Sequence, residues 1–303
     1  MATIAGVGIY RPPADAPLAR RVTGSDLAGV SYRVQADQGV NTASLAAGAA
    51  RAALKAAAAN PADVEMIIVG TTTPDVLWPT TACLVQTELK LPMVASFDLY
   101  AAEASLLSAL NVGVRYISAG AKSVLLIGAD SDNQLVDLPG QGGAVHGRAA
   151  AAAVLTRAGG EGGVLSTMAG GAARPESNGE ASDRTVLQGL TEAATECLAK
   201  ASLSLEEIDL VIGEQSAPEI TQAWSKTAGL SPDRLLLDPA RYGTLLSAAP
   251  LLALHDAVKE GRLQSGMTAL VLACGSGPTW AGACLRWGGG GLASASPGVE
   301  RRA

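Results

Sequence analysis

FDLYAAEASLLSAL, residues 97–110, is the stretch that decides the fold. Its first four residues have the apolar, aromatic composition of a buried strand, and its last seven have the pattern of a helix. A strand that turns directly into a helix is typical of layered α/β proteins. Glu103 lies at that turn, where the positive end of the helix dipole would stabilise a carboxylate.

Outward from this stretch, apolar runs that end in glycine or small polar residues alternate with amphipathic segments. Continuous apolar runs are typical of strands buried on both faces of a parallel sheet. We expect strands at 3–10, 64–73, 94–100, 122–131, 149–157, 208–216, 234–240, 268–277 and 279–288. We expect helices at 41–59, 80–91, 104–120, 184–203, 220–230 and 245–263, the first capped by Asn41 or Thr42.

Two segments interrupt this alternation. Residues 138–184 are rich in glycine, which predicts turns and loops around a single strand at 149–157. The tail at 288–303 consists mostly of glycine and small residues, and we expect it to be disordered.

The two halves of the chain resemble each other. FDL at 97 and LDP at 237 are 140 positions apart (237 − 97), and LLSAL at 106 and LLSAA at 245 are 139 apart (245 − 106). A duplicated α/β unit would leave such offsets. We therefore predict a layered fold of two pseudo-duplicated halves, at 1–165 and 166–287.

The composition excludes several classes of partner. The chain is 48% hydrophobic but 3% aromatic, so alanine and leucine must fill the core, and its net charge is −6 without any block of like charge. Neither nucleic acid nor an anionic membrane is expected as a partner. The alanine-rich run at 43–59 is interrupted by Arg51 and Lys55, too early for a membrane span, and the first residues lack the features of a signal peptide. We expect a cytoplasmic protein.

The cysteines indicate no metal or cofactor site. Cys83, Cys197, Cys274 and Cys284 are widely separated and contain no CxxC pair. We expect reduced thiols, with Cys83 and Cys274 as small core residues rather than nucleophiles, because free cysteine is among the most often buried residue types.

These segments together resemble a known family, the ketoacyl synthase III group of the thiolase superfamily. The resemblance covers about residues 1–287 and is most specific at the end, where YGTLLSAAPLLALHDAVKEGRLQSGMTALVLACGSGPTWAGACLRW follows the family order of helix, glycine turn, Thr-Trp and last strand. It implies a thiolase-like α/β/α/β/α fold. It also implies an acyl thioester substrate, on acyl carrier protein or CoA, and a dimer formed through the strand at 94–100.

The family's catalytic groups are replaced in this chain. Where the family has Ala-Ala-Cys this sequence has Ala101-Ala102-Glu103, and where the family has the histidine of His-Gln-Ala-Asn it has Glu214. The asparagine of Tyr/His-Gly-Asn is Thr244. A carboxylate that attacks a thioester gives a mixed anhydride far less stable than the thioester, so ordinary Claisen condensation by this chain alone is not expected.

Two functions stay open. The chain is either a triad-deficient partner subunit that shapes the acyl site of a ketosynthase heterodimer, or a repurposed enzyme. The repurposed enzyme could be a homodimer or a heterodimer. Such an enzyme would cyclise, hydrolyse or dehydrate a ketoacyl substrate with Glu103 and Glu214 as acid and base, because two carboxylates in one apolar pocket raise the pKa of one of them. An acyl transferase that avoids a covalent intermediate is a further alternative. Specialised polyketide or fatty-acid biosynthesis is the setting that the resemblance implies.

Other residues are weaker candidates. Trp78, and the turn Gly275, Ser276 and Gly277, are expected to line the substrate site, although core packing is as good an explanation for Trp78 and for Trp280. The turn lacks the GK[ST] of a phosphate loop. His255 is expected on a helix surface, and His146 in a glycine-rich loop. Arg148 would either pair with Glu103 or face solvent.

Overall fold

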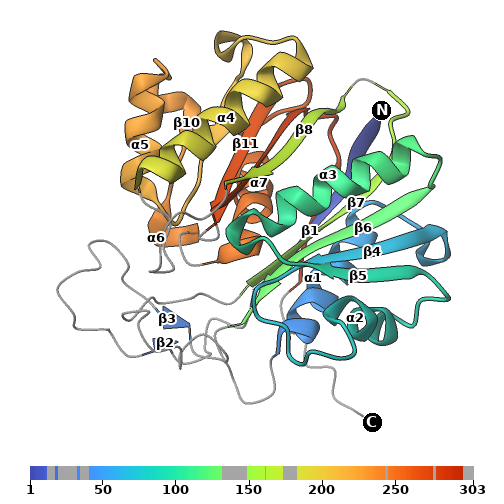
Figure 1. The fold of residues 1–303 in the computed structure, drawn as a ribbon. Coiled ribbons are helices and arrows are strands. Elements are labelled where there is room, and N and C mark those ends of the chain that lie inside the picture. Colours follow the sequence, from blue (N-terminus) through green and yellow to red (C-terminus); the bar gives the residue numbers. More distant parts are fainter. Residues whose placement is uncertain are drawn as a thin grey trace.

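The computed structural model describes residues 1–11, 41–131, 149–160, 162–172, 183–242, 245–275 and 278–295, and the backbone of two short strands, β2 (Leu18–Ala19) and β3 (Arg33–Val34). Within these residues the chain forms two large β-sheets, with helices between them and on their outer faces (Figure 1). β2 and β3 pair with each other and belong to neither sheet.

The first sheet has six strands: β1 (Ala2–Tyr10), β4 (Val64–Gly70), β5 (Ala95–Leu99), β6 (Ser123–Asp130), β7 (Ala149–Arg157) and β13 (Gly291–Ala295). Their order is β13-β1-β7-β6-β4-β5, which leaves β5 at one edge. β4 runs parallel to β5 and β6, and β7 runs antiparallel to β6 and β1. Every residue of β6 is buried, as its continuous apolar sequence predicts.

The second sheet has five strands: β8 (Gly163–Gly171), β9 (Leu210–Ile212), β10 (Leu235–Leu236), β11 (Thr268–Gly275) and β12 (Thr279–Arg286). Their order is β10-β9-β11-β12-β8. β9 runs parallel to β10 and β11, whereas β12 runs antiparallel to β11 and β8.

Seven α-helices and five short 3-10 turns connect these strands within the described residues. The helices are α1 (Thr42–Ala56), α2 (Thr81–Leu89), α3 (Ser105–Ser118), α4 (Asp183–Ala201), α5 (Pro218–Thr227), α6 (Pro239–Tyr242) and α7 (Ala249–Lys259). The 3-10 turns are η1 (Pro61–Asp63), η2 (Ala102–Ala104), η3 (Leu205–Glu207), η4 (Pro232–Arg234) and η5 (Leu246–Ala248).

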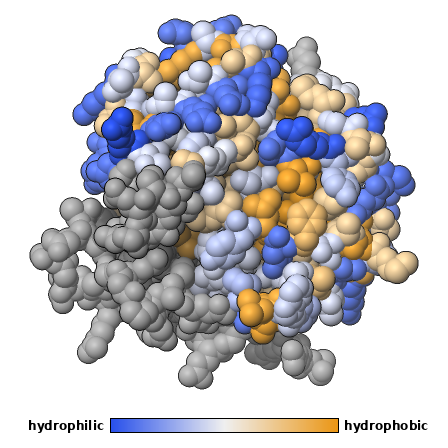
Figure 2. Space-filling model, in the orientation of Figure 1, coloured by the Kyte–Doolittle hydropathy of each residue, from blue (hydrophilic) through white to orange (hydrophobic). Residues whose placement is uncertain are grey.

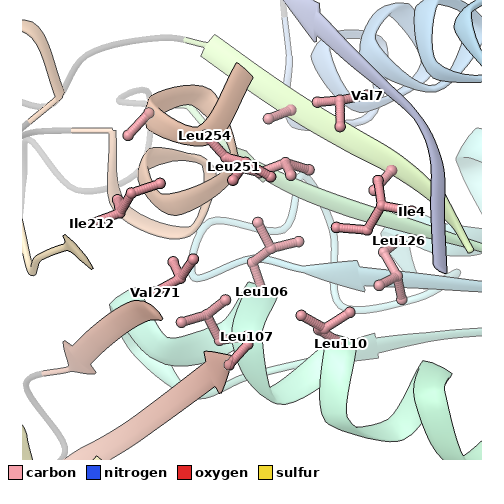
Figure 3. Packing of buried hydrophobic residues seen from close by; sticks show 14 of the residues in the cluster. Ile4, Val7, Leu106, Leu107, Leu110, Leu126, Ile212, Leu251, Leu254 and Val271 are labelled. Atoms are coloured by element: carbon pink, nitrogen blue, oxygen red, sulfur yellow. The ribbon is translucent and has the colours of Figure 1, made fainter. Parts of the chain in front are cut away.

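The elements stack in five layers, which confirms the predicted fold class. α1 and α2 pack on the outer face of the first sheet, and α4 and α5 pack on the outer face of the second. α3 and α7 lie between the sheets (Figure 1). Leu106, Leu107 and Leu110 of α3 face Leu251 and Leu254 of α7 in the central cluster (Figure 3). A small cavity at this place is lined by apolar side chains alone.

Carboxylates hold the starts of α1 and α2. Asp75 accepts the backbone N–H groups of Thr42 and Ala43, both at 2.8 Å, and Asn41 caps the same helix as the sequence predicts. Asp98 of β5 accepts the N–H groups of Thr81 and Ala82 at the start of α2. In both helices an acidic side chain satisfies amide groups that have no partner within the helix.

The two central helices reveal the duplication. Each follows a 3-10 turn whose first residue has left-handed backbone geometry, Ala102 with φ 49° before α3 and Leu246 with φ 44° before α7. The two residues are 144 positions apart (246 − 102). The predicted offset of 140 agrees with the starts of β5 and β10, but the match between the two LLSA segments is wrong. LLSAL lies inside α3, whereas LLSAA contains the turn η5.

The structure corrects two expectations about the segments between and after the halves. β8 was not predicted, because its sequence GVLSTMAGG looks like the glycine-rich loops beside it; its pairing with β12 supplies the partner that its sequence does not show. β8 begins at Gly163 and belongs to the second sheet. Part of the tail expected to be disordered forms β13, which pairs in parallel with β1. Residues 296–303 lie outside the described residues.

Candidate functional site

Glu103 lies in the turn that joins β5 to α3. The N–H of Ala101 donates to Ser105 Oγ (2.8 Å), whose hydroxyl donates to the carbonyl oxygen of Ala102 (2.6 Å). From β12, Thr279 Oγ1 donates to the carbonyl oxygen of Ala101 (3.0 Å). Left-handed backbone costs a residue such as Ala102 about 1–2 kcal/mol. These hydrogen bonds therefore hold a strained turn in place, and they fix the half-buried Glu103 at the start of the helix.

Gly275 lies directly against this turn. A Cβ atom at this position would lie 2.7 Å from Ala102 Cβ and 2.8 Å from the carbonyl oxygen of Ala101. Glycine is thus required at the end of β11 because the turn of the other half approaches its backbone so closely. Of the predicted substrate-site turn, Ser276 and Gly277 lie outside the described residues.

Glu214 follows β9 and is 4% exposed. Its Oε1 accepts hydrogen bonds from the N–H and the hydroxyl of Ser216, both at 2.8 Å. Its Oε2 accepts the backbone N–H of Cys274, also at 2.8 Å. Burial raises the pKa of the Glu214 carboxyl, while these hydrogen bonds favour the ionised form. Both oxygen atoms are therefore engaged by groups of the protein.

Cys274 links the two candidate carboxylates. Its thiol is buried, and its pKa is raised to about 12, first by burial, then by the charge of Glu214, then by the charge of Glu103. Both carboxylates lie near the end of β11, because Glu214 bonds to the backbone of Cys274 and the turn that carries Glu103 packs against Gly275. The remaining described cysteines do not share this site, and the pKa of Cys197 and of Cys284 is raised by burial, to about 11 and about 12.

Several other predicted residues lie elsewhere or outside the described part. Thr244, His146 and Arg148 are outside it. Trp78 is 82% exposed, so it packs in no core, whereas Trp280 is buried at 3%. His255, expected on a surface, is 1% exposed; this expectation was wrong because the whole start of α7 is enclosed between the two sheets.

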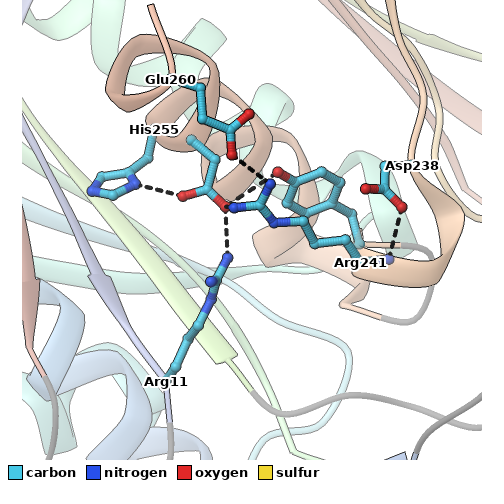
Figure 4. Close-up of polar contacts among 7 residues, drawn as sticks. Arg11, Asp238, Arg241, His255 and Glu260 are labelled. Atoms are coloured by element: carbon cyan, nitrogen blue, oxygen red, sulfur yellow. Dashed lines mark hydrogen bonds and ion pairs between the residues drawn. The ribbon is translucent and has the colours of Figure 1, made fainter.

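His255 belongs to a polar cluster that sequence reasoning missed (Figure 4). Its Nδ1 lies 2.9 Å from Oδ1 of Asp256, and Oδ2 of Asp256 accepts hydrogen bonds from Arg11 (2.7 Å) and from the hydroxyl of Tyr242 (3.1 Å). Arg241 forms an ion pair with the same Oδ2 (2.8 Å). Burial would raise the pKa of Asp256, but the His255 hydrogen bond and the two guanidinium groups lower it well below its usual range.

Asp130 is a second buried carboxylate that sequence reasoning missed, and it joins the two halves at the turn η5. Asp130, at the end of β6, is 2% exposed and accepts the N–H of Thr72 (2.7 Å) and the N–H of Ser247 in η5 (3.0 Å). Burial raises the pKa of its carboxyl. A signal for both missed carboxylates was present in the sequence, since each stands in or at the end of an apolar run where an unpaired charge would be costly.

Gln215, beside Glu214, connects this site to α6. Its Nε2 donates to the carbonyl oxygens of Gly213 (2.8 Å) and Leu236 (3.0 Å), and its Oε1 accepts the N–H of Asp238 (2.9 Å). The start of α6 is thereby held by the residue next to Glu214.

Among the residues that the structure describes, no group of three His, Cys, Asp or Glu side chains could hold a metal ion. No helix of the described chain is long and apolar enough to cross a membrane.

Comparisons with known proteins agree with this architecture. Residues 97–172 match the family model of 3-oxoacyl-[acyl-carrier-protein (ACP)] synthase III, and residues 198–287 match the model of its C-terminal part. The beta-ketoacyl-[acyl-carrier-protein] synthase III of Xylella fastidiosa (strain 9a5c) is 32% identical in an alignment that covers 94% of this chain and 98% of the relative. That of Coxiella burnetii (strain RSA 493 / Nine Mile phase I) is 33% identical in an alignment that covers 94% of this chain and 99% of the relative.

Solved structures are similar to the whole fold. The 3-oxoacyl-[acyl-carrier-protein] synthase III from Aquifex aeolicus VF5 has a TM-score of 0.85 and 29% identity, covering 95% of this chain and 100% of that chain. A variant of OleA from Xanthomonas campestris has a TM-score of 0.80 at 20% identity, covering 94% and 98%, and shows the fold alone. The five layers are thus those of a thiolase-like protein. Within that class, the chain belongs to the beta-ketoacyl-[acyl-carrier-protein] synthase III family.

Proposed function

We propose that this chain is a partner subunit of a ketosynthase complex, which shapes the acyl site and forms no acyl-enzyme bond itself. Its relatives are named for beta-ketoacyl-[acyl-carrier-protein] synthesis, so the proposed substrate class is an acyl thioester on acyl carrier protein or CoA. Fatty-acid or polyketide biosynthesis is the proposed setting, and the second subunit is a ketosynthase-like chain that retains the cysteine and histidine.

The proposal rests on the hydrogen bonds that the carboxylate of Glu214 accepts from the protein. This residue stands where the resemblance places the family's catalytic histidine, and its carboxylate accepts hydrogen bonds from the N–H and hydroxyl of Ser216 and from the N–H of Cys274. These hydrogen bonds occupy three of the about four acceptor positions of a carboxylate, which leaves little of it to take a proton from a substrate. A carboxylate that holds β9 to β11 is better suited to a structural role.

The site also offers no thiolate. Burial and the two carboxylates raise the pKa of the Cys274 thiol to about 12, so it stays protonated at neutral pH, whereas the thiolate is the nucleophilic form. Glu103, at the position of the family's cysteine, would form an unstable mixed anhydride with an acyl group. Neither residue therefore favours covalent acyl transfer by this chain.

The exposed apolar surface around β5 favours a partner chain. β5 is an edge strand of its sheet, and Met93 (100%) before it and Tyr100 (71%) after it are exposed. Leu77 (81%) and Trp78 (82%) are exposed shortly before α2, whose first residue bonds to Asp98 of β5. Figure 2 shows hydrophobic surface gathered on this side of the molecule. Such features mark interaction sites. The backbone N–H and C=O groups of an edge strand can pair with another chain, and exposed apolar groups gain free energy when a partner removes them from water.

The alternative function is an acyl-processing enzyme that uses Glu103 and Glu214 as acid and base. One observation favours it: the charges of both carboxylates act on the same Cys274 thiol, and burial raises the pKa of Glu214. A raised pKa next to a second carboxylate is a common arrangement in acid/base sites. The reaction class would be cyclisation, hydrolysis or dehydration of a ketoacyl chain.

Reconstitution separates the two functions. The purified chain, alone and together with the ketosynthase-like chain from the same host, is incubated with acyl and malonyl thioesters, and products are measured by mass spectrometry. The partner-subunit proposal predicts product only from the pair, and unchanged turnover of the pair when this chain carries Glu103→Gln or the exposed control Glu65→Gln. If this chain turns over substrate alone, and Glu103→Gln abolishes that turnover, the chain is the acyl-processing enzyme instead.

A further inference from the structure

Asp256 is a charged residue on an otherwise apolar part of α7. Every residue from Ala249 to Ala257 is buried, and the side chain of Asp256 is 3% exposed. A buried carboxylate costs several kcal/mol unless its partners compensate for the lost water. An apolar side chain would cover the same surface at lower cost, so packing alone does not explain a charge at this place.

The partners of Asp256 come from three separate elements. Arg11 follows β1 of the first sheet, Arg241 and Tyr242 belong to α6 beside the second sheet, and His255 is on α7 itself (Figure 4). Arg11, Arg241 and Tyr242 all reach the same atom, Oδ2. One oxygen atom thus connects residues 230 positions apart (241 − 11), of which one follows a strand of the first sheet and the other lies on a helix that follows β10 of the second sheet.

The charges around this atom are balanced. Arg11 and Arg241 are the cations and Asp256 is the buried anion, while the exposed Glu260 takes the outer nitrogen of Arg241 at 2.7 Å. The guanidinium of Arg241 also lies over the ring of Tyr242, 5.3 Å from its centre. Arg241 therefore has two anionic partners, of which Glu260 contacts α6 alone and Asp256 contacts both α6 and the end of β1.

We infer that Asp256 is a positioning residue, which holds the end of β1 and the end of α6 in a fixed relation across the two sheets. Tyr242, the last residue of α6, precedes by two positions Thr244, where the sequence places the family's third catalytic group. Asp256 thus holds the last described residue before that position. The relevance of this to an acyl site rests on the proposed function; the connection between Arg11 and Tyr242 does not.

Hydrogen exchange of the full-length chain tests the connection. Asp256→Asn keeps the size of the side chain but removes the charge that both arginines share. We expect amide exchange to rise about tenfold or more both at residues 9–11 and at residues 239–242. The control Glu260→Gln removes a partner of Arg241 alone, and should raise exchange at 239–242 without affecting 9–11.

A second variant keeps the inference testable if Asp256→Asn unfolds. Arg11 has a 42% exposed side chain, so Arg11→Gln should fold, and within the described part of the chain its hydrogen bond and ion pair go to Asp256 and not to α6. The inference predicts that Arg11→Gln nevertheless raises exchange at 239–242, because the shared carboxylate loses one of its two cations. Exchange that changes at residues 9–11 alone would overturn the inference, as would an Asp256→Asn effect confined to α7.

The link to function has its own readout. In the reconstituted pair, Asp256→Asn should alter the chain-length distribution of the products, or kcat with little change in KM, while Glu260→Gln leaves both as they were. An exchange effect in the absence of any active pair would leave the positioning role intact and overturn the proposed function. Unchanged products together with increased exchange would show that the position of α6 does not matter for the acyl site.

Discussion

The carboxylate of Glu214 accepts the backbone N–H of Cys274 at 2.8 Å and so joins the loop after β9 to the end of β11. The first half has a related contact with the roles exchanged. There the carboxylate is Asp130, at the end of β6, and the donor is the N–H of Thr72 after β4. Cys274 follows Asp130 by 144 positions (274 − 130), the same offset as the two turns before the central helices.

Replacing Glu214 should weaken the protein. In Glu214→Gln the amide NH2 group must face the N–H of Cys274 or the donors of Ser216, which leaves donors opposed in a buried place. We expect a loss of about 1–3 kcal/mol in the free energy of unfolding, measured by urea denaturation. Glu219→Gln, at an exposed position five residues on, should change it by less than about 0.5 kcal/mol. Equal stability of the two variants would show that Glu214 has no structural role.

The same carboxyl makes stability depend on pH. Because burial raises its pKa above the unfolded value of 4.5, the folded state holds the proton more tightly than the unfolded state. Its contribution is therefore fully present below about pH 4.5 and is lost as pH rises toward the folded pKa. Between wild type and Glu214→Gln, the difference in unfolding free energy should accordingly grow as pH falls over this window. A difference that is independent of pH would contradict the raised pKa.

The close approach at Gly275 predicts a steric effect. Gly275→Ala places a methyl group 2.7 Å from Ala102 Cβ and 2.8 Å from a carbonyl oxygen, so the turn that carries Glu103 must shift. We expect a loss of about 1–3 kcal/mol of stability, measured by thermal unfolding. Gly159→Ala is the matched control, since a Cβ there meets nothing within 4 Å. Full stability of Gly275→Ala would mean that the turn has room to move.

The left-handed backbone of Ala102 predicts a mutation that increases stability. Ala102→Gly relieves a conformation that alanine adopts at a cost, and should raise the free energy of unfolding by about 0.5–1 kcal/mol after the extra flexibility of the unfolded chain is counted. Ala104, in right-handed backbone geometry with φ −79°, is the control, and Ala104→Gly should destabilise. If both variants destabilise equally, the turn is not strained.

The thiols should differ in reactivity. Cys83 is partly exposed, and hydrogen bonds from Ser96 and Thr80 lower its pKa, whereas burial raises the pKa of the other cysteines. Alkylation of the native protein at pH 8, followed by peptide mass spectrometry, should label Cys83 first and leave Cys274 unlabelled. In denaturant all four should react at similar rates. Early labelling of Cys274 would indicate an open, ionisable site next to Glu103.

Much of the fold was predictable from the sequence, because continuous apolar runs such as that of β6 leave few alternatives to a buried strand. β8 and β13 were not, since their small residues have little strand propensity and depend on pairing with β12 and β1. For the candidate site, the resemblance predicted that Glu103 follows a strand and that Glu214 lies near the end of one, and in the structure they come just after β5 and β9. It could not show that Glu214 is bonded to Cys274, or that Asp256 draws Arg11 and Tyr242 together, because such contacts arise only when distant segments meet.

Restoring the family's nucleophile should not restore condensation. In Glu103→Cys the new thiol would lie near Glu214, whose charge disfavours a thiolate, and the positions of the histidine and asparagine would still hold Glu214 and Thr244. We expect no ketoacyl product from this variant alone, as measured by mass spectrometry of the acyl species. Ready formation of product would show that the family's catalytic positions are assigned wrongly in this chain.

The most direct test of the partner-subunit proposal is native mass spectrometry of the protein purified from its own host without added partners. The proposal predicts a heterodimer whose second chain retains the cysteine and histidine of an active ketosynthase. A homodimer would contradict it, because no neighbouring subunit would then supply a thiol, and Glu103 and Glu214 would become the residues to test as catalysts.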